Sequence, residues 1–295
     1  MSANIFDTIV ELPSKSALES SQNLIGFENR FLRVFNNLKL LIDTDGIKEW
    51  SETHHGIVLP IVNLIMDKYP LIIFEGDAGT GKTASALGIA DRITRELKKE
   101  GFFIKLSTRV RGEGLHGQMG NLVNDAFDRL KKEAGKNRIA FLLIDEADAI
   151  ATTRSTLQMH QEEKSAVNTL IQKIDDIREL KGRAIVMLST NRIHFIDEAI
   201  VRRAGVIIKF ERPDFDERLQ LFENDLKGSI ITQEQIKTLA EISGPEQNND
   251  LGFSYSDLRL RVLPEAIAKA YPNSPLSFEI IEETIKDLSP SPKIK

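Results

Sequence analysis

The feature that most limits the fold of this 295-residue chain is a series of short apolar segments separated by longer amphipathic ones. All but the second apolar segment are almost continuously apolar, as in buried strands that are covered on both faces. Strands alternating with helices predict a parallel α/β sheet with right-handed crossovers. The five expected strands cover 71–74, 102–106, 139–144, 184–188 and 206–210, and the helices between them cover 83–99, 118–134 and 162–180.

The two ends of the chain depart from this alternation. Residues 1–22 are rich in Ser, Asn and Glu, and we expect them to be flexible ahead of a large domain at 23–210. After residue 210 only helical patterns follow, which predicts a small all-helical domain at 211–289. The Ser-Pro-rich end is expected to fray, leaving a flexible tail at 290–295. The four helices of the small domain are expected near 214–227, 232–243, 254–271 and 277–288.

The segment from Gly76 to Thr83 reads Gly-Asp-Ala-Gly-Thr-Gly-Lys-Thr and matches the phosphate-loop pattern G-x-x-x-x-G-K-[ST]. Its glycines let backbone N–H groups turn inward around phosphates, Lys82 reaches the β- and γ-oxygens, and the Thr83 hydroxyl ligates Mg²⁺. The following helix adds its positive N-terminal end. A chance match in a chain of this length is about one in a hundred. We therefore expect ATP and Mg²⁺ at Asp77, Ala78, Gly79, Thr80, Gly81, Lys82, Thr83 and Ala84.

A pair of carboxylates, Asp145 and Glu146, directly follows the expected strand 139–144. In phosphate-loop proteins an Asp at such a position holds Mg²⁺ together with the loop threonine. A Glu immediately after it can act as the general base for an attacking water. The spacing from Lys82 favours a sheet in which this strand lies beside the strand that carries the loop. Capping of the next helix is the alternative interpretation of the pair.

Two further polar features flank the last expected strands. Asn191 follows the strand 184–188, where it could orient the attacking water, although Asn is also a common turn residue. Arg202 and Arg203 precede the strand 206–210, too far along the sheet to reach the nucleotide of their own chain. An arginine there fits the arginine-finger role on a neighbouring subunit's γ-phosphate, with a solvated helix end as the alternative. The finger role would make hydrolysis a property of an oligomer.

Taken together, these motifs and the helical C-terminal domain resemble the AAA+ ATPases over nearly the whole chain from residue 23 onward. The resemblance implies ATP hydrolysis, with Thr83 and Asp145 as Mg²⁺ ligands. The segment Asn-Leu-Ile-Gly at 23–26 resembles the part of that family that lines the adenine pocket, which implies nucleotide contacts for Ile25 and Gly26. The catalytic residues implied are Lys82, Glu146, Asn191 and Arg203.

Residues 252–259, Gly-Phe-Ser-Tyr-Ser-Asp-Leu-Arg, resemble the lid signature that carries the second nucleotide sensor of AAA+ ATPases. The sensor arginine of the family falls near Ser256, and we assign its role to Arg259. Arg261 on the same helix, or loss of this sensor, are the alternatives. Ser254 and Asp257 also fit an ordinary capping box.

Within AAA+ ATPases, the tracts at 166–175, 196–204 and 260–264 are similar to the pachytene-checkpoint ATPases, which remodel HORMA-domain proteins. The finger of that subgroup matches Arg203, whereas Arg202 stands at an acidic position. Only about twenty residues precede the ATPase domain, as in short bacterial relatives found beside HORMA proteins and cyclic-oligonucleotide synthases in anti-phage systems. The resemblance implies a HORMA-domain partner as substrate and a homo-hexamer.

A glycine-rich segment lies between the second expected strand and the next helix, and it carries Leu115 and His116. AAA+ unfoldases grip peptide in the central pore at this position, so we assign these two residues to a substrate pore loop. Leu115 replaces the usual bulky aromatic residue. An ordinary flexible crossover, rich in glycine, is the alternative.

Composition narrows the remaining choices. The net charge is −5 and no basic stripe is visible, which argues against a clamp loader or replication initiator acting on DNA, so nucleic acid is not expected as a partner. A nucleotide-gated signalling switch would carry sensor repeats or an effector domain, for which the chain has no room. The chain contains no cysteine, signal peptide or membrane-spanning stretch, so we expect no membrane association and a cytoplasmic location.

Overall fold

The computed structural model describes residues 5–106, 119–152, 161–245 and 251–293. The chain divides into two compact units, which are described separately below. The first unit comprises Met1–Asn23, Phe27–Glu75 and Thr83–Lys209. The second comprises Leu24–Gly26, Gly76–Lys82 and Phe210–Lys295. The phosphate loop and the expected adenine segment therefore group with the C-terminal helices.

The first unit is built on a six-stranded sheet with the order β1-β3-β4-β5-β2-β6. The pairs β3–β4, β4–β5 and β2–β5 are parallel, which confirms the predicted α/β class. All five expected strands form, and β1 adds a sixth that runs antiparallel to β3, which corrects the expected strand number. The strands are β1 Phe6–Leu12, β2 Leu71–Gly76, β3 Gly101–Leu106, β4 Ile139–Ile144, β5 Ala184–Thr190 and β6 Val206–Phe210.

Within residues 5–22 the chain forms β1 and a helix, which corrects the expectation of a flexible segment there; residues 1–4 lie outside the described residues. Along β1, more buried and more exposed residues alternate, and this period of two suits a strand buried on one face. The helix α1, Lys15–Gln22, is tied to the body of the unit: the Ser14 amide donates to Asp91 at 2.6 Å, and Arg95 donates to the Ser14 carbonyl at 2.9 Å. Because Thr8 lies on the more buried face and Ile9 on the exposed one, the sequence of β1 does not show the apolar alternation of a typical strand.

The order of the strands also corrects an expectation about the site. Chain spacing predicted that β4, which precedes Asp145, lies beside β2, but β5 lies between them. In a parallel sheet each crossover helix can carry the chain past a neighbour, so sequence spacing does not determine which strands pair. Because β5 is in the middle, Thr190 at its end lies opposite Glu75 of β2.

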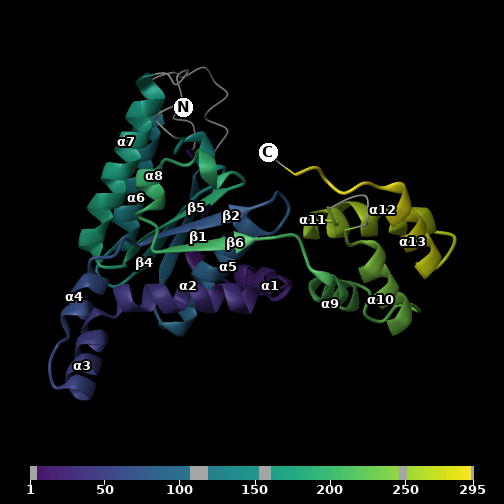
Figure 1. Cartoon of the computed structure of the whole chain (residues 1–295), viewed down its shortest axis with the longest axis horizontal. Coiled ribbons are helices and arrows are strands. Elements are labelled where there is room, and N and C mark those ends of the chain that lie inside the picture. Colours follow the sequence, from purple (N-terminus) through teal and green to yellow (C-terminus); the bar gives the residue numbers. More distant parts are fainter. Residues whose placement is uncertain (1–4, 107–118, 153–160, 246–250, 294–295) are drawn as a thin grey trace. The chain divides into compact units, whose positions relative to one another are not determined.

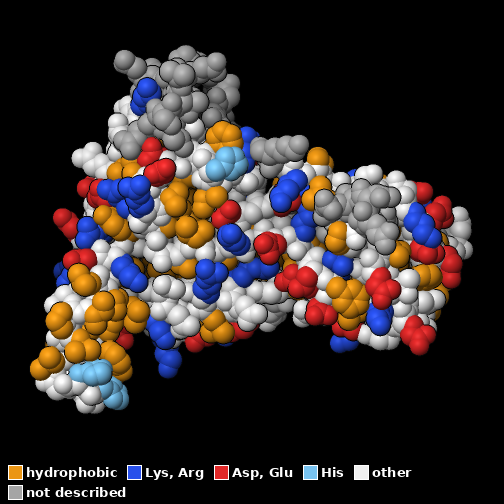
Figure 2. Space-filling model, in the orientation of Figure 1, with side chains coloured by type: hydrophobic (Ala, Val, Ile, Leu, Met, Phe, Trp, Pro, Cys, Tyr) orange, Lys and Arg blue, Asp and Glu red, His pale blue; other side chains and the backbone are white. Residues whose placement is uncertain are grey.

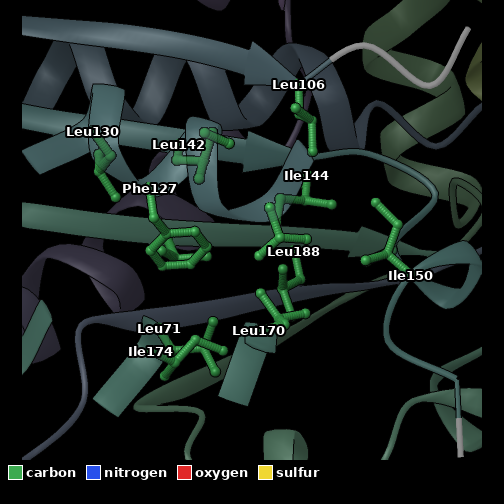
Figure 3. Close-up of a cluster of buried hydrophobic side chains, with 14 of the residues drawn as sticks. Leu71, Leu106, Phe127, Leu130, Leu142, Ile144, Ile150, Leu170, Ile174 and Leu188 are labelled. Carbon is green, nitrogen blue, oxygen red and sulfur yellow. The ribbon is translucent and has the colours of Figure 1, made fainter. Parts of the chain in front are cut away.

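Helices cover both faces of this sheet (Figure 1). On one face are α6, Met119–Ala134, and α7, Gln161–Asp176; on the other are α2, Phe27–Ile42, and α5, Lys82–Glu96. In β2, β4 and β5, alternate apolar residues join one core cluster with α6 and α7, and the apolar residues between them are buried as well. Burial on both faces explains the continuous apolar strands. Figure 3 labels Leu71, Leu106, Phe127, Leu130, Leu142, Ile144, Ile150, Leu170, Ile174 and Leu188 of this core.

Between α2 and β2 the chain forms two helices that were not predicted, α3 Thr44–His55 and α4 Pro60–Met66. Ser51 closes the turn between them, because its buried hydroxyl accepts from the Leu59 amide at 2.9 Å and donates to the Ile57 carbonyl at 3.0 Å. Hydrophobic side chains are visible on the surface of this helix pair (Figure 2). Those more than two-fifths exposed are Trp50, Ile57, Ile61 and Leu64.

The C-terminal part of the second unit is all-helical, as predicted, and the capping boxes Asp214–Glu217 and Thr232–Gln235 both form. Its apolar core includes Ile25 from the N-terminal part of the chain. None of the helices in the described ranges combines the length and apolar character needed to cross a membrane. The helices are α9 Phe215–Asp225, α10 Gln233–Ile242, α11 Tyr255–Asp257, α12 Leu263–Ala270 and α13 Phe278–Asp287, with a π-helical turn, Leu258–Val262, between α11 and α12.

The described part of the expected flexible tail, residues 290–293, is held through Ser291, and residues 294–295 lie outside the described residues. The Ser291 amide donates to Asp257 at 3.2 Å, and the Ser291 hydroxyl also hydrogen-bonds Asp257. Arg212 donates to the Ser291 carbonyl at 2.6 Å. The partners that hold the tail lie at least 28 residues away in the chain, so the local Ser-Pro composition could not reveal them.

Candidate nucleotide-binding site

The phosphate loop, Gly76–Lys82, has a backbone that only glycine can supply at two positions. Gly76 has a φ of +149°, and a Cβ there would stand 1.9 Å from the Phe210 carbonyl oxygen. Gly79 has a φ of +73°, and a Cβ there would stand 2.6 Å from the Ser256 Cβ. The left-handed backbone and the close approach of neighbouring chain both exclude a side chain.

Lys82 and Thr80 stabilise this loop from within. The Lys82 ammonium donates to the carbonyls of Gly76 at 2.8 Å and Asp77 at 2.7 Å. The Thr80 hydroxyl donates to the Asp77 carbonyl at 2.8 Å. Lys82 and Thr80 are both buried. Since α5 begins at Lys82, an ammonium group and a helix N-terminus meet at one glycine-rich loop, the arrangement that binds phosphate groups.

Asp77 of the loop forms a buried ion pair that sequence reasoning missed. Its carboxylate accepts from Arg212 at 2.8 Å, and the two side chains are only 9% and 11% exposed. Arg212 also donates to the carbonyls of Gly252 at 2.7 Å and Ser291 at 2.6 Å. The sequence did contain a signal for this ion pair, namely Asp77 itself, because a carboxylate in a phosphate-binding loop requires a compensating cation.

The lid signature contacts the loop through Ser256, whose amide donates to the Gly79 carbonyl at 3.1 Å. This is the position at which the sensor arginine of AAA+ ATPases falls. Arg259, to which we assigned that role, forms a bidentate ion pair with Asp225 at 2.6 and 2.8 Å. Arg261 donates to Asp257 at 2.8 Å. That Arg259 contacts the nucleotide stays a prediction, and in this structure its guanidinium is paired with Asp225.

Asp257 is the centre of a hydrogen-bonded cluster in the lid. Burial by itself would raise the pKa of its carboxyl, but hydrogen bonds from Ser291, Ser254 and Arg261 outweigh it and lower the pKa to about 2. Ser254 and Asp257 also form the predicted capping box. The carboxylate is therefore ionised at neutral pH, and it accepts five hydrogen bonds.

The expected adenine segment also belongs to the second unit. Ile25 is 5% exposed and packs in the apolar core of the lid with Phe253 and Tyr255. Gly26 has a φ of +68°, which favours glycine. Leu24 lies 4.0 Å from where a Cβ on Gly81 would be, so the segment borders the phosphate loop.

Asp145, in the first unit, directly follows β4 and has three polar side-chain partners, Thr83, Lys105 and Ser189. Its Oδ2 accepts from the Thr83 hydroxyl at 2.8 Å and lies 3.1 Å from the Lys105 ammonium. Burial raises the pKa of this carboxyl, whereas hydrogen bonds from Thr83, Lys105 and Ser189 together lower it below its ordinary value. Lys105 was missed, although a lysine within a central strand was a visible departure from the apolar pattern.

The donors at this point suit Mg²⁺. The Thr83 hydroxyl and the Asp145 carboxylate are hard oxygen ligands, which Mg²⁺ prefers, and they already lie within hydrogen-bonding distance of each other. Among the described residues no group of three or more His, Asp or Glu side chains could hold a metal ion by itself. This is consistent with an ion that takes its other ligands from phosphate oxygens and water.

Glu146 and Asn191 follow the ends of neighbouring strands. Glu146 is exposed and has a left-handed backbone, with φ 49° and ψ 46°, which is uncommon for a residue with a side chain and is frequent at functional sites. Asn191 follows β5 directly, and Thr190 before it donates to Asp148 at 2.9 Å. Because Ile144 and Leu188 are paired, the ends of β4 and β5 lie at the same edge of the sheet.

Arg203 is held away from this edge by its own chain. It donates to Asp175 at 2.7 and 3.1 Å and to the Ala199 carbonyl at 2.9 Å, and its guanidinium lies 5.4 Å from the centre of the Tyr69 ring. The hydrogen bonds to Asp175 raise the pKa of Arg203, so it stays charged. Arg202 is 80% exposed and pairs with Glu198. Leu115 and His116 lie outside the described residues.

A family model of AAA ATPases, described as "ATPase family associated with various cellular activities", matches residues 72–212. The fold, the phosphate loop and the strand-end carboxylate therefore define an AAA ATPase. The chain is 44% identical over 291 residues to CD-NTase-associated protein 6 of Escherichia coli strain KTE188, covering 98% of this chain and 97% of that protein. It is 34% identical over 296 residues to the protein of the same name from strain MS 115-1, covering 98% and 95%. The chain belongs to this family of AAA ATPases.

Solved structures agree with this membership. A chain in the E. coli MS115-1 HORMA:CdnC:Trip13 complex matches with a TM-score of 0.91 and 32% identity, over 98% of this chain and 97% of that one. Rhizobiales Trip13 matches with a TM-score of 0.76 and 29% identity, over 97% and 99% of the two chains. The resemblance to AAA+ ATPases predicted from the motifs is confirmed.

Proposed function

We propose that this protein is an ATP-driven remodeller of a HORMA-domain protein, acting as a homo-hexamer in a bacterial anti-phage signalling system. The observation that carries the proposal is the likeness, at a TM-score of 0.91 over 98% of the chain, to a structure of a HORMA:CdnC:Trip13 complex. The 44% identity to a CD-NTase-associated protein over almost the full length of both chains supports the same system.

In this proposal the phosphate loop binds ATP and the strand ends carry out hydrolysis. Lys82 and the loop amides hold the phosphates, and Thr83 and Asp145 hold Mg²⁺, which neutralises phosphate charge. The exposed Glu146 accepts the proton of the attacking water, and Asn191 orients that water. The neighbouring ends of β4 and β5 support this division of roles.

Hydrolysis in one subunit would depend on Arg203 of the next. Within one chain Arg203 is engaged by Asp175, so it must exchange this carboxylate for the γ-phosphate of a neighbour. Both partners are anionic, and the side chain is 23% exposed, which makes the exchange accessible at the surface. Assembly into a ring would therefore switch hydrolysis on.

The work of the ring would be done on a peptide of the HORMA-domain partner, gripped by Leu115 and His116 and threaded through the pore. We expect Leu115→Ala and His116→Ala to bind and hydrolyse ATP but to leave the partner unchanged. Remodelling is measured by hydrogen exchange of the HORMA protein with and without ATP, with Lys82→Ala as the inactive control. Wild-type protein that hydrolyses ATP without altering the HORMA protein would refute the proposed function.

A further inference from the structure

The phosphate loop contains a carboxylate, Asp77, where a polyanion is expected to bind. An ionised carboxylate close to phosphate groups repels them, and the repulsion is large where water is excluded. Asp77 is 9% exposed, so solvent does little to screen it. Among the described residues, Arg212 forms an ion pair with this carboxylate at 2.8 Å. The net charge of the loop therefore depends on a residue 135 positions away.

Arg212 uses all three of its nitrogens in the second unit. Nε donates to Asp77, Nη1 donates to the Gly252 carbonyl at 2.7 Å, and Nη2 donates to the Ser291 carbonyl at 2.6 Å. A planar guanidinium with three partners in fixed directions has little freedom to move. One side chain thus links the phosphate loop, the lid and the C-terminal tail.

The tail is anchored a second time, at Asp257. Ser291 donates its amide to Asp257, and its hydroxyl bonds the same carboxylate. Asp257 in turn bonds Ser254, whose hydroxyl lies 2.9 Å from where a Cβ on Gly79 would be. The tail is therefore linked to the phosphate loop indirectly, through Arg212 and Asp77 on one side and through Asp257 and Ser254 on the other.

We propose that Arg212 is a positioning residue for nucleotide binding that cancels the charge of Asp77, and that the tail at Ser291 is a strap that holds Arg212 in place. The proposal rests on the proposed function to the extent that the loop binds ATP. It predicts a charge effect that a merely structural role would not produce. Removing the charge of Asp77 should restore most of the nucleotide affinity that is lost when Arg212 is replaced.

The first test is a double-mutant cycle on ADP affinity, measured by calorimetry with Arg212→Met, Asp77→Asn and the double variant. We expect Arg212→Met to weaken ADP binding by about tenfold or more in the wild-type background, as one uncompensated charge near phosphates requires. In the Asp77→Asn background the same change should cost about threefold or less. Lys269→Met, which removes an exposed lid cation paired with Asp287, is the matched control. Equal losses in both backgrounds would overturn the charge role of Arg212.

The second test needs no nucleotide. Ser291→Pro removes the amide and hydroxyl that bond Asp257 in an otherwise complete chain, and Ser289→Ala is the control because Ser289 contributes only its carbonyl, to Arg261. We expect hydrogen exchange of the peptide covering 76–82 to become several-fold faster in Ser291→Pro and in Arg212→Met. Unchanged exchange in both variants would overturn the strap. Failure of the wild-type protein to bind ADP or ATP would refute the ATPase function instead, while this measurement still decides the strap.

Discussion

The phosphate loop with its lid and the carboxyl end of the sheet handle their acidic residues in opposite ways. In the loop and lid, Asp77 and Asp257 are buried and held by arginine and serine partners. At the strand ends, Asp145 is 18% exposed beside Lys105, and Glu146 is exposed. The first region keeps its charges fixed, and the second leaves them available. Binding benefits from groups that do not move, whereas hydrolysis needs groups that can change partners.

The pairing at Asp145 shows how an available charge is kept ready. Lys105 and the Thr83 hydroxyl share one carboxylate oxygen, so a divalent cation can replace the ammonium without moving the carboxylate. Arg203 belongs to the same available class, since its partner Asp175 is 40% exposed. The predictions below test this division between fixed and available charges.

The largest effect is expected for Arg203→Ala. If Arg203 leaves Asp175 to stabilise charge on a neighbour's γ-phosphate, ATP turnover should fall by about 10³-fold or more, with assembly retained. Turnover and sedimentation are measured together. Mixing this variant with Lys82→Ala should restore part of the activity, because each supplies what the other lacks. Absence of any restoration would indicate that Arg203 acts within its own chain.

Glu146→Gln should lower turnover by about 10²- to 10⁴-fold, because the amide cannot accept the proton of water. ATP affinity should stay near that of the wild type, as measured by calorimetry. Glu52→Gln, at an exposed position on α3, is the control. Substantial hydrolysis by the Glu146 variant would move the general base elsewhere and weaken the contrast between the two regions.

Asp257 should stabilise the fold in a pH-dependent manner. Its folded pKa of about 2 lies below the ordinary value of 3.8, so its contribution is present above about pH 4 and is lost as the pH falls through about 2. The shift corresponds to about 2 kcal/mol. Urea unfolding of the wild type and Asp257→Asn at pH 6 and pH 3 measures this difference. An equal gap in stability at both pH values would show that the charge is not the cause.

The smallest effect is expected for Lys105→Met. Removing the ammonium that competes for Asp145 should lower the Mg²⁺ concentration needed for half-maximal turnover by several-fold, an effect of the size expected for one partly exposed charge. A Mg²⁺ titration of turnover measures it, with Lys132→Met on the surface of α6 as the control. The two cations would then have opposite effects: Arg212 at the phosphate loop favours nucleotide binding, whereas Lys105 beside Asp145 opposes the binding of Mg²⁺. A higher Mg²⁺ requirement would mean that Lys105 orients Asp145 rather than competing for it.

Several parts of the site could be read directly from neighbouring residues. The phosphate loop, the Asp145–Glu146 pair after a buried strand, and the capping boxes are set by backbone preferences and apolar periodicity over a few positions. Such short-range constraints act wherever the segment ends up in the fold. The capping boxes Asp214–Glu217 and Thr232–Gln235 form as predicted, and the AAA family model covers residues 72–212.

Other parts depended on the assembled chain. The position of β5 between β4 and β2, the pairing of β1 with β3, and the ion pair of Asp77 with Arg212 join residues far apart in sequence. Local periodicity is the same for every strand order, and a polar side chain has many partners of suitable charge. Tertiary packing selects one of these partners, because it determines which polar groups are buried next to each other and must therefore pair. The docked tail at Ser291 is the clearest case, since its Ser-Pro composition by itself indicates fraying.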